Sequence, residues 1–188
     1  MLKIIPLWFI RYKFFNSLFL GVSVGAIFTL YAPLEPSIYS LGGVLLAMGM
    51  LLVARLYHHI LNANWFFKIS LFVEITLLLA MFYFLYASYS YQTALLLYIG
   101  YQITFVFGSY LIRAETLLLQ SDTLLTKLDT AKQLGYLFGM GISYATYKVF
   151  AYYGITDSQT QVYNLHYLLI GIEIVVIVFI FKSFKRVY

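Results

Sequence analysis

Long apolar stretches separated by short polar segments dominate this chain. Six of them reach roughly seventeen residues or more, the length that a helix needs to cross the hydrocarbon core of a bilayer. They cover residues 14–31, 37–54, 65–86, 93–112, 133–153 and 165–181. The pattern predicts an all-α membrane protein: a single domain of six transmembrane helices, preceded by an interfacial lead-in at residues 1–12.

The most highly charged segment, residues 113–132, lies between the fourth and fifth apolar stretches. It carries six of the nineteen charged side chains. A charged segment between two apolar runs is typical of an aqueous crossing between two membrane helices. We therefore expect a charged cytoplasmic hinge at this position.

The composition supports a membrane protein over a soluble one. Hydrophobic residues make up 63% of the chain and charged residues only 10%, against roughly a quarter charged in soluble domains. The chain has no cysteine, which excludes disulfides, thiolate metal sites and a cysteine nucleophile. It also lacks a phosphate-binding Walker loop and a G-x-S-x-G elbow, and its histidines lack metal-ligand spacing. We expect no enzyme, no metal site and no cofactor.

The distribution of basic residues predicts the orientation. Eleven of the twelve Lys and Arg residues fall on the side that holds both termini, and the exception, Lys148, lies inside a predicted span. Cytoplasmic loops are enriched in Lys and Arg. Both termini are therefore expected to be cytoplasmic, in a multi-pass protein of the cytoplasmic (inner) membrane. This orientation also accounts for the net charge of +5, so nucleic acid is not an expected partner.

Glu74 and Glu173 are the main candidates for chemistry. An ionised acid at mid-membrane costs at least about 2.5–3.5 kcal/mol, so it is protonated, paired or facing water. One interpretation is a proton or cation site, and the other is a structural hydrogen bond between helices. Each acid lies within a similar segment, LFVEITLLL or LIGIEIVVIV. The two segments cross in opposite directions, which is compatible with two inverted three-helix repeats.

Other polar residues within the spans are weaker candidates for a substrate or proton pathway. Lys148 could neutralise an anionic substrate, pair with Glu173, or extend to the outer surface. Asn16, Gln102 and Thr104 could line a cavity or join helices by hydrogen bonds. Each residue therefore has both a functional and a structural interpretation.

Arg55, Arg113 and Glu115 lie at the cytoplasmic ends of predicted helices. They could form a cytoplasmic gate or simply solvate the helix ends. Five glycines are predicted to let helices, or two copies of the chain, approach closely. These are Gly21, Gly25, Gly43, Gly135 and Gly139.

Two segments resemble the major facilitator superfamily of transporters. Residues 124–144, LLTKLDTAKQLGYLFGMGISY, are similar to that family's lead into helix 5. Residues 52–59, LVARLYHH, lie where the family has its Leu-Ala-Asp-Arg-x-Gly-Arg-Arg loop. Leu52 and Arg55 match that loop, whereas Ala54 stands in place of its acid.

The resemblance implies a fold and a function. Family members have twelve helices in two six-helix halves, so this chain would be a half-length member that works as a homodimer or with a second six-helix half. It would be a secondary active transporter of a small solute, acting by alternating access. In the family, helices 1 and 4 line the cavity, helices 2 and 5 meet the other half, and helices 3 and 6, which would carry Glu74 and Glu173 here, lie outside. The alternative is a non-transporting scaffold or accessory subunit that associates through glycine-rich helix faces.

Overall fold

A computed structural model describes residues 2–186 of the chain. Nearly all of them are helical, and the elements follow one another in this order: β1 (Leu2–Ile4), α1 (Pro6–Ser23), a 3-10 turn (Val24–Ala26), α2 (Ile27–Tyr31), α3 (Pro36–Arg55), α4 (Tyr57–Ile60), α5 (Ala63–Tyr86), α6 (Tyr91–Val106), α7 (Gly108–Leu119), α8 (Asp122–Tyr152), α9 (Ser158–Ser183) and β2 (Phe184–Arg186).

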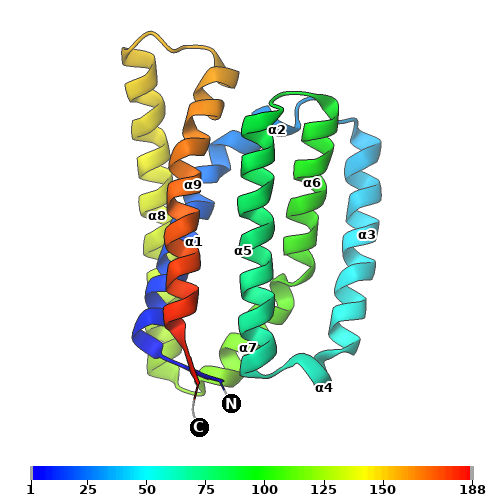
Figure 1. Cartoon of the computed structure of the whole chain (residues 1–188), viewed down its shortest axis with the longest axis vertical. Coiled ribbons are helices and arrows are strands. Elements are labelled where there is room, and N and C mark those ends of the chain that lie inside the picture. Colours follow the sequence, from blue (N-terminus) through cyan, green and yellow to red (C-terminus); the bar gives the residue numbers. More distant parts are fainter. Residues whose placement is uncertain (1, 187–188) are drawn as a thin grey trace.

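Five helical stretches are long and apolar enough to cross a membrane. They are Pro6–Tyr31, Pro36–Arg55, Ala63–Tyr86, Tyr91–Leu119 and Ser158–Ser183. They indicate a multi-pass, α-helical membrane protein. The 31-residue helix α8 runs beside them along the height of the bundle (Figure 1). Its charged first turns and its glycine and tyrosine content make it less apolar, so the sixth span remains a prediction.

The helices differ from the predicted ranges at several ends. The first begins at Pro6 rather than at residue 14, because proline at the first helical position has a backbone angle suited to a helix. The expected lead-in is therefore largely helical. The fourth continues past a break at Phe107 into α7. The charged hinge is helical at both ends and turns at Gln120, whose φ of 47° is left-handed, before Ser121 caps α8.

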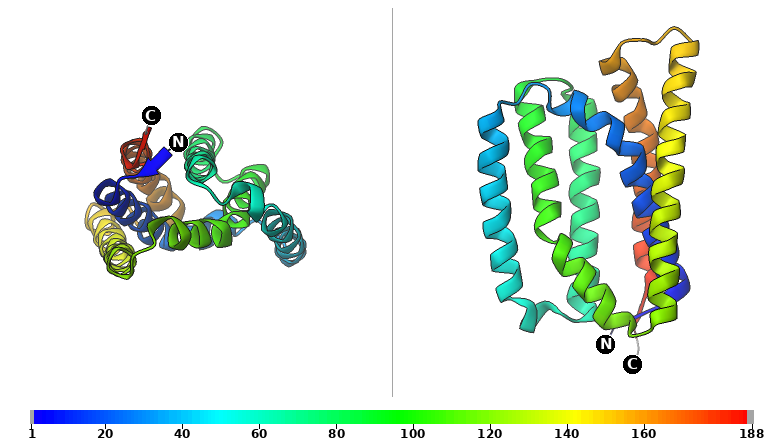
Figure 2. Two further views of the ribbon diagram at one scale, coloured as in Figure 1. Left: turned by 90° about the horizontal axis from the view of Figure 1, so that it is seen from below. Right: turned by 180° about the vertical axis from the view of Figure 1, so that it is seen from behind.

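The helices form two groups that meet mainly where α5 packs against α9. In the first group α1 packs against α8 and α9, and in the second α6 packs against α5 and α3. The contact between α5 and α9 joins the groups, and α7 runs across the end of the bundle between them (Figure 2). Helix α3 lies at the edge, where only Gly42 and Val53 are buried.

The predicted glycines pack in different ways. Gly135 and Gly139 of α8 touch the backbone of α1, and a Cβ added at Gly139 would lie 3.0 Å from the Cα of Gly21. Gly25 lies against a tyrosine ring of α8, whereas a Cβ at Gly43 would meet nothing within 4 Å. Four of the five glycines therefore pack inside one chain, and a contact between copies remains a prediction.

A short antiparallel sheet, absent from the sequence-based prediction, pairs β1 with β2. Leu2 lies opposite Arg186, and Ile4 lies opposite Phe184. The Phe184 ring packs on the α5 rings of Phe66 and Phe67 at centroid distances of 5.9 and 5.2 Å. We call the β1–β2 pair the terminal clasp. It places both ends of the described chain on one side of the bundle (Figure 1).

Candidate functional site

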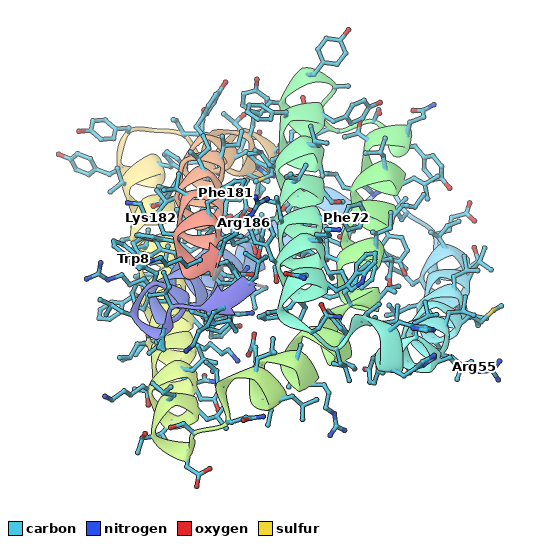
Figure 3. All side chains as sticks on the ribbon, turned by 60° about the horizontal axis from the view of Figure 1, so that its bottom comes forward. Trp8, Arg55, Phe72, Phe181, Lys182 and Arg186 are labelled. Carbon is cyan, nitrogen blue, oxygen red and sulfur yellow. The ribbon has the colours of Figure 1, made fainter. Side chains whose placement is uncertain are left out.

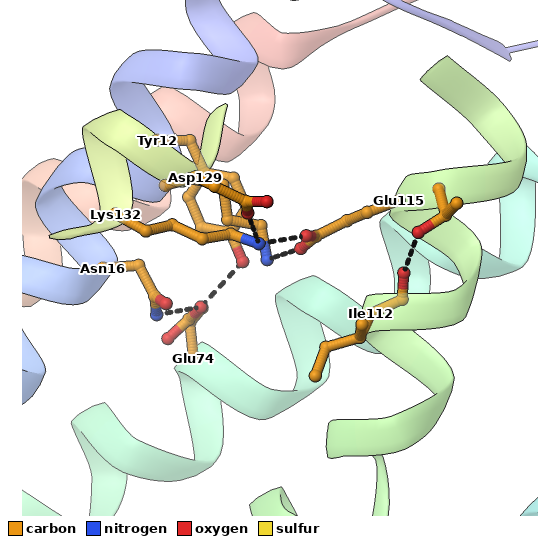
Figure 4. A network of polar contacts seen from close by, with 9 residues as sticks. Tyr12, Asn16, Glu74, Ile112, Glu115, Asp129 and Lys132 are labelled. Carbon is orange, nitrogen blue, oxygen red and sulfur yellow. Dashed lines mark hydrogen bonds and ion pairs between the residues drawn. The ribbon is translucent and has the colours of Figure 1, made fainter. Parts of the chain in front are cut away.

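Glu74 lies near the middle of α5, where this helix meets α1. Its side chain is almost fully buried, with 1% of the residue exposed. The Tyr12 hydroxyl donates a hydrogen bond to Glu74 Oε1 at 2.9 Å, and the Asn16 amide donates to the same oxygen at 2.8 Å (Figure 4). Tyr12 and Asn16 reach one carboxyl group because they are four residues apart on α1, on the same helix face.

Glu173 of α9 is also fully buried and lies next to the Glu74 carboxyl group. We call Glu74 and Glu173 the acid pair. Apart from the contact between the two carboxyl groups, both oxygens of Glu173 and Glu74 Oε2 lack a hydrogen-bond partner among residues 2–186. Since buried polar atoms are nearly always hydrogen-bonded, three such oxygens at one place make the acid pair unusual.

A second polar group, the ion cluster of Lys13, Glu115, Asp129 and Lys132, lies between the acid pair and the end of the bundle that holds the terminal clasp. Lys13 of α1 pairs with Glu115 Oε1, and Lys132 of α8 pairs with Glu115 Oε2 at 2.6 Å. Asp129 lies 3.3 Å from Lys132 and is mostly exposed. Glu115 itself is buried. Through its two ion pairs, this one carboxylate of α7 joins both α1 and α8 (Figure 4).

Helix α1 connects the acid pair with the ion cluster. Tyr12 contacts Glu74, while the adjacent Lys13 contacts Glu115. Polar groups thus run from the interior of the bundle to the exposed carboxylate of Asp129. An acid pair with unpartnered oxygens can accept or release a proton, and the ion cluster can rearrange its pairing when helices move.

The remaining predicted pathway residues on α6 do not join the acid pair. Thr104 donates its hydroxyl hydrogen bond to the Tyr101 carbonyl of its own helix at 2.7 Å. Gln102 lines a cavity of about 320 Å³ between α3 and α6, together with Tyr98 and aliphatic side chains. Its Oε1 has no hydrogen-bond partner in the described part of the chain. Of the three uncharged candidates, Asn16 alone contacts an acid.

Neither Lys148 nor the two predicted gate arginines take part in the ion cluster. Lys148 is exposed, with its ammonium 5.5 Å from the centre of the Tyr144 ring, and it does not pair with either acid. Arg55 and Arg113 are also exposed. Of the three gate candidates, only Glu115 belongs to the ion cluster.

Tyr12, Lys13 and Lys132 belong to the site but were not singled out from the sequence. The two lysines were counted only as orientation signals, and Tyr12 fell in the expected lead-in. The sequence does contain a signal for a buried ion pair, because Lys13 lies inside an apolar run, seven residues beyond Pro6. A cation at that depth needs an acidic partner or a path to water.

No metal site is found within residues 2–186, where no three His, Asp or Glu residues cluster. The buried His166 has its Nδ1 2.7 Å from the Val162 carbonyl oxygen, and its ring packs on Phe84 at 4.1 Å. These contacts hold the imidazole within the bundle.

No family model, curated protein or solved structure matches this chain. The resemblance to the major facilitator superfamily therefore rests on the two sequence segments, and the functional argument rests on the geometry of the acid pair and the ion cluster.

Proposed function

We propose that this chain is a six-helix subunit of a secondary active transporter for a small solute, with the acid pair as its proton-binding site. Helix α8 would be the sixth crossing. The observation that carries the proposal is the burial of two adjacent carboxyl groups, Glu74 and Glu173, with no partner for three of their four oxygens apart from each other. Two adjacent carboxyl groups can hydrogen-bond to each other only when at least one of them carries a proton, so the contact itself provides a place where a proton is held.

The chemistry of two adjacent carboxyl groups supports this role. Like charges in one buried site repel strongly, so neighbouring carboxyl groups share protons and titrate together. Tyr12 and Asn16 both donate to Glu74 Oε1, which stabilises negative charge on that residue. Glu173 has no such donors within the described residues. The pair is thus suited to exchanging a proton when access changes.

The pattern of helix contacts supports an inverted repeat. If α1, α3 and α5 correspond to α6, α8 and α9, then the α1–α8 contact corresponds to α6–α3, and α1–α9 corresponds to α6–α5. The α5–α9 contact joins two helices that correspond to each other, so exchanging the two repeats leaves this contact unchanged. The acid pair would then contribute one acid from the third helix of each repeat. Repeats of this kind allow alternating access by exchanging the conformations of their two halves.

The ion cluster is proposed as a cytoplasmic gate. Glu115 pairs with lysines from two helices at once, so a small movement of α1 against α8 would break one pair and keep the other. In the expected orientation this cluster lies on the cytoplasmic side of the acid pair. It would close the pathway on that side while the opposite side is open.

A dimer, or a second six-helix half, completes the proposal. The exposed outer surface of α3 and the rest of α8 would meet the other half, as helices 2 and 5 do in the resembling family. The alternative scaffold role is weaker, because Gly21, Gly135 and Gly139 already pack inside the chain. They are not free to join a different protein.

The test uses purified protein in proteoliposomes on a solid-supported membrane. An inward proton gradient is applied, and a panel of uncharged and weakly charged solutes is screened for transient currents. We expect at least one solute to give a current, and Glu74→Gln and Glu173→Gln each to abolish it. Glu35→Gln, which removes an exposed acid outside the bundle, is the matched control and should leave the current intact.

Wild-type currents in both acid-pair variants would reject the proton site. Infrared spectroscopy adds a readout that needs no solute, since a titrating buried carboxyl group gives a carbonyl band that disappears on substitution by glutamine. If neither variant loses such a band, the acid pair does not bind a proton in the tested pH range.

A further inference from the structure

The surface of the terminal clasp carries five exposed basic residues. The strands and the adjacent helix ends supply Lys3, Arg11, Lys182, Lys185 and Arg186. We call this set the basic clasp surface. The pairing of β1 with β2 brings together residues from the two ends of the described chain, so the cluster exists only in the folded protein.

An aromatic ring lies among these cations. The Arg11 guanidinium is 4.6 Å from the centre of the Trp8 ring, and the Lys182 ammonium is 4.8 Å from the same centre. Figure 3 shows Trp8 and Lys182 next to each other at the clasp, with Arg55 at the opposite edge of the molecule. Tryptophan prefers the headgroup level of a bilayer, so these cations would lie at the same depth.

Within residues 2–186, no acidic side chain forms an ion pair with the basic clasp surface. The ion pairs among residues 2–186 involve only Lys13 and Lys132 as cations. Lys3 and Lys185 lie directly opposite each other across the two strands, an arrangement in which like charges are destabilising. The described part of the fold therefore holds these cations together without pairing them to an acidic side chain.

Exposed apolar side chains flank the cations. Leu7 is 59% exposed and Phe181 is 57% exposed, and in the sequence they directly precede Trp8 and Lys182. A free phosphate ion would gain nothing from these two side chains, whereas an acyl chain would cover them. Positive charge beside apolar surface at headgroup depth is complementary to an anionic phospholipid.

We infer that the basic clasp surface binds the phosphate of an anionic phospholipid in the cytoplasmic leaflet, with Leu7 and Phe181 against its acyl chains. The site holds α1 and α9 together from outside, because its cations come from both ends of the described chain. It requires the membrane orientation argued above but not the transport activity.

The test measures lipid proximity through Trp8. The chain has two tryptophans, so Trp65→Phe leaves Trp8 as the only one. The variant is placed in nanodiscs with a small fraction of brominated phosphatidylglycerol or brominated phosphatidylcholine, and tryptophan quenching is recorded. We expect preferential quenching by phosphatidylglycerol, and a loss of about fivefold in that preference for each of Lys182→Gln and Lys185→Gln.

Arg55→Gln is the matched control, since it removes one exposed cytoplasmic cation far from the clasp. Equal quenching by the two lipids, or an equal loss in Arg55→Gln and the lysine variants, would overturn the proposal in favour of general surface charge. Added inorganic phosphate should not compete, and competition at equal ionic strength would also overturn it. Because Lys182 and Lys185 are exposed, their glutamine variants should fold, which thermal unfolding in detergent checks.

Discussion

The α1–α8 and α3–α6 contacts each join two helices of the bundle, yet they are built differently. In the first, Gly135 and Gly139 let two backbones touch. In the second, the Tyr98 ring fills the space beside Gly42, and a cavity of about 320 Å³ remains between the helices. One contact is closely packed, and the other is loose.

The difference shows that glycine spacing alone does not create a helix contact. Helix α3 has two adjacent glycines, but Gly43 meets no neighbouring atom. Close approach requires that the backbone of a partner helix lie opposite the glycine, as α1 does opposite Gly135 and Gly139. The ion cluster lies beside the closely packed contact, while Gln102 lies in the loose one. The closely packed α1–α8 contact and the cavity between α3 and α6 therefore lie in different parts of the bundle.

Breaking the ion cluster should give the largest effect on stability. Glu115→Ala leaves Lys13 buried without its partner, which costs about 3–5 kcal/mol. Thermal or SDS-induced unfolding in detergent measures this loss. Arg113→Ala, an exposed charge on the same helix, should change little, and replacing Lys13 and Glu115 together by Met and Leu should recover most of the loss. A mild effect of Glu115→Ala would mean that the cluster is not formed.

Filling the closely packed contact should have the next largest effect. Gly139→Leu forces side-chain atoms into the α1 backbone, and overpacking costs about 1–3 kcal/mol. Gly43→Leu places the same side chain where no neighbour lies within 4 Å, so its unfolding temperature should stay near that of the wild type. Equal loss in the two variants would show that the two contacts do not differ.

The loose contact should tolerate, and even gain from, loss of its polar group. Gln102→Leu removes an unpartnered buried oxygen and should raise the free energy of unfolding by about 1 kcal/mol. Asn16→Leu is the matched comparison, because it removes a donor to Glu74 and should lower stability. If Gln102→Leu is destabilising, the amide has a partner that this conformation lacks.

The smallest effect concerns the start of α9. The Thr160 backbone N–H and hydroxyl donate to the Asp157 carboxylate at 2.8 Å each, and these bonds lower its pKa. A lowered folded-state pKa means that the stabilisation is present at neutral pH and is lost as the pH falls through that pKa, below about 4. Asp157→Asn keeps an acceptor but should remove the contribution of Asp157 to the pH dependence of unfolding in this range, leaving that of ion-paired carboxylates such as Glu115.

Glu35 provides a comparison at the start of α3, since its side chain makes no capping hydrogen bond there. Glu35→Gln should leave the acid-range stability profile unchanged. A profile for Asp157→Asn that still matches the wild type would assign the pH dependence to another group.

The apolar pattern was sufficient to locate five of the helices and the charged turn between α7 and α8. It also singled out Glu74 and Glu173, because an acid inside an apolar run is visible in any sequence. The spacing of residues along one helix, however, says little about which other helix lies opposite. The proximity of Glu173 to Glu74 depends on the crossing of α5 and α9, which the weak similarity of their segments could only suggest.

The ion cluster and the terminal clasp could not be predicted for a related reason. Lys13 and Lys132 are 119 positions apart, and both fit the general excess of cytoplasmic cations. Three-residue strands such as β1 carry too little pattern to be distinguished from a loop. Their pairing depends on where α1 and α9 end in space. Long-range contacts of this kind come from the packed bundle and not from local preference.

The packing of α1 against two helices from the second half of the chain has a consequence for biogenesis. The helices against which α1 packs, α8 and α9, are both made after most of the chain has been synthesised. During translation α1 must therefore wait in the bilayer while α3, α5 and α6 associate. A nascent chain halted after α6 should hold its first helix loosely, and docking of that helix would be a late step in assembly.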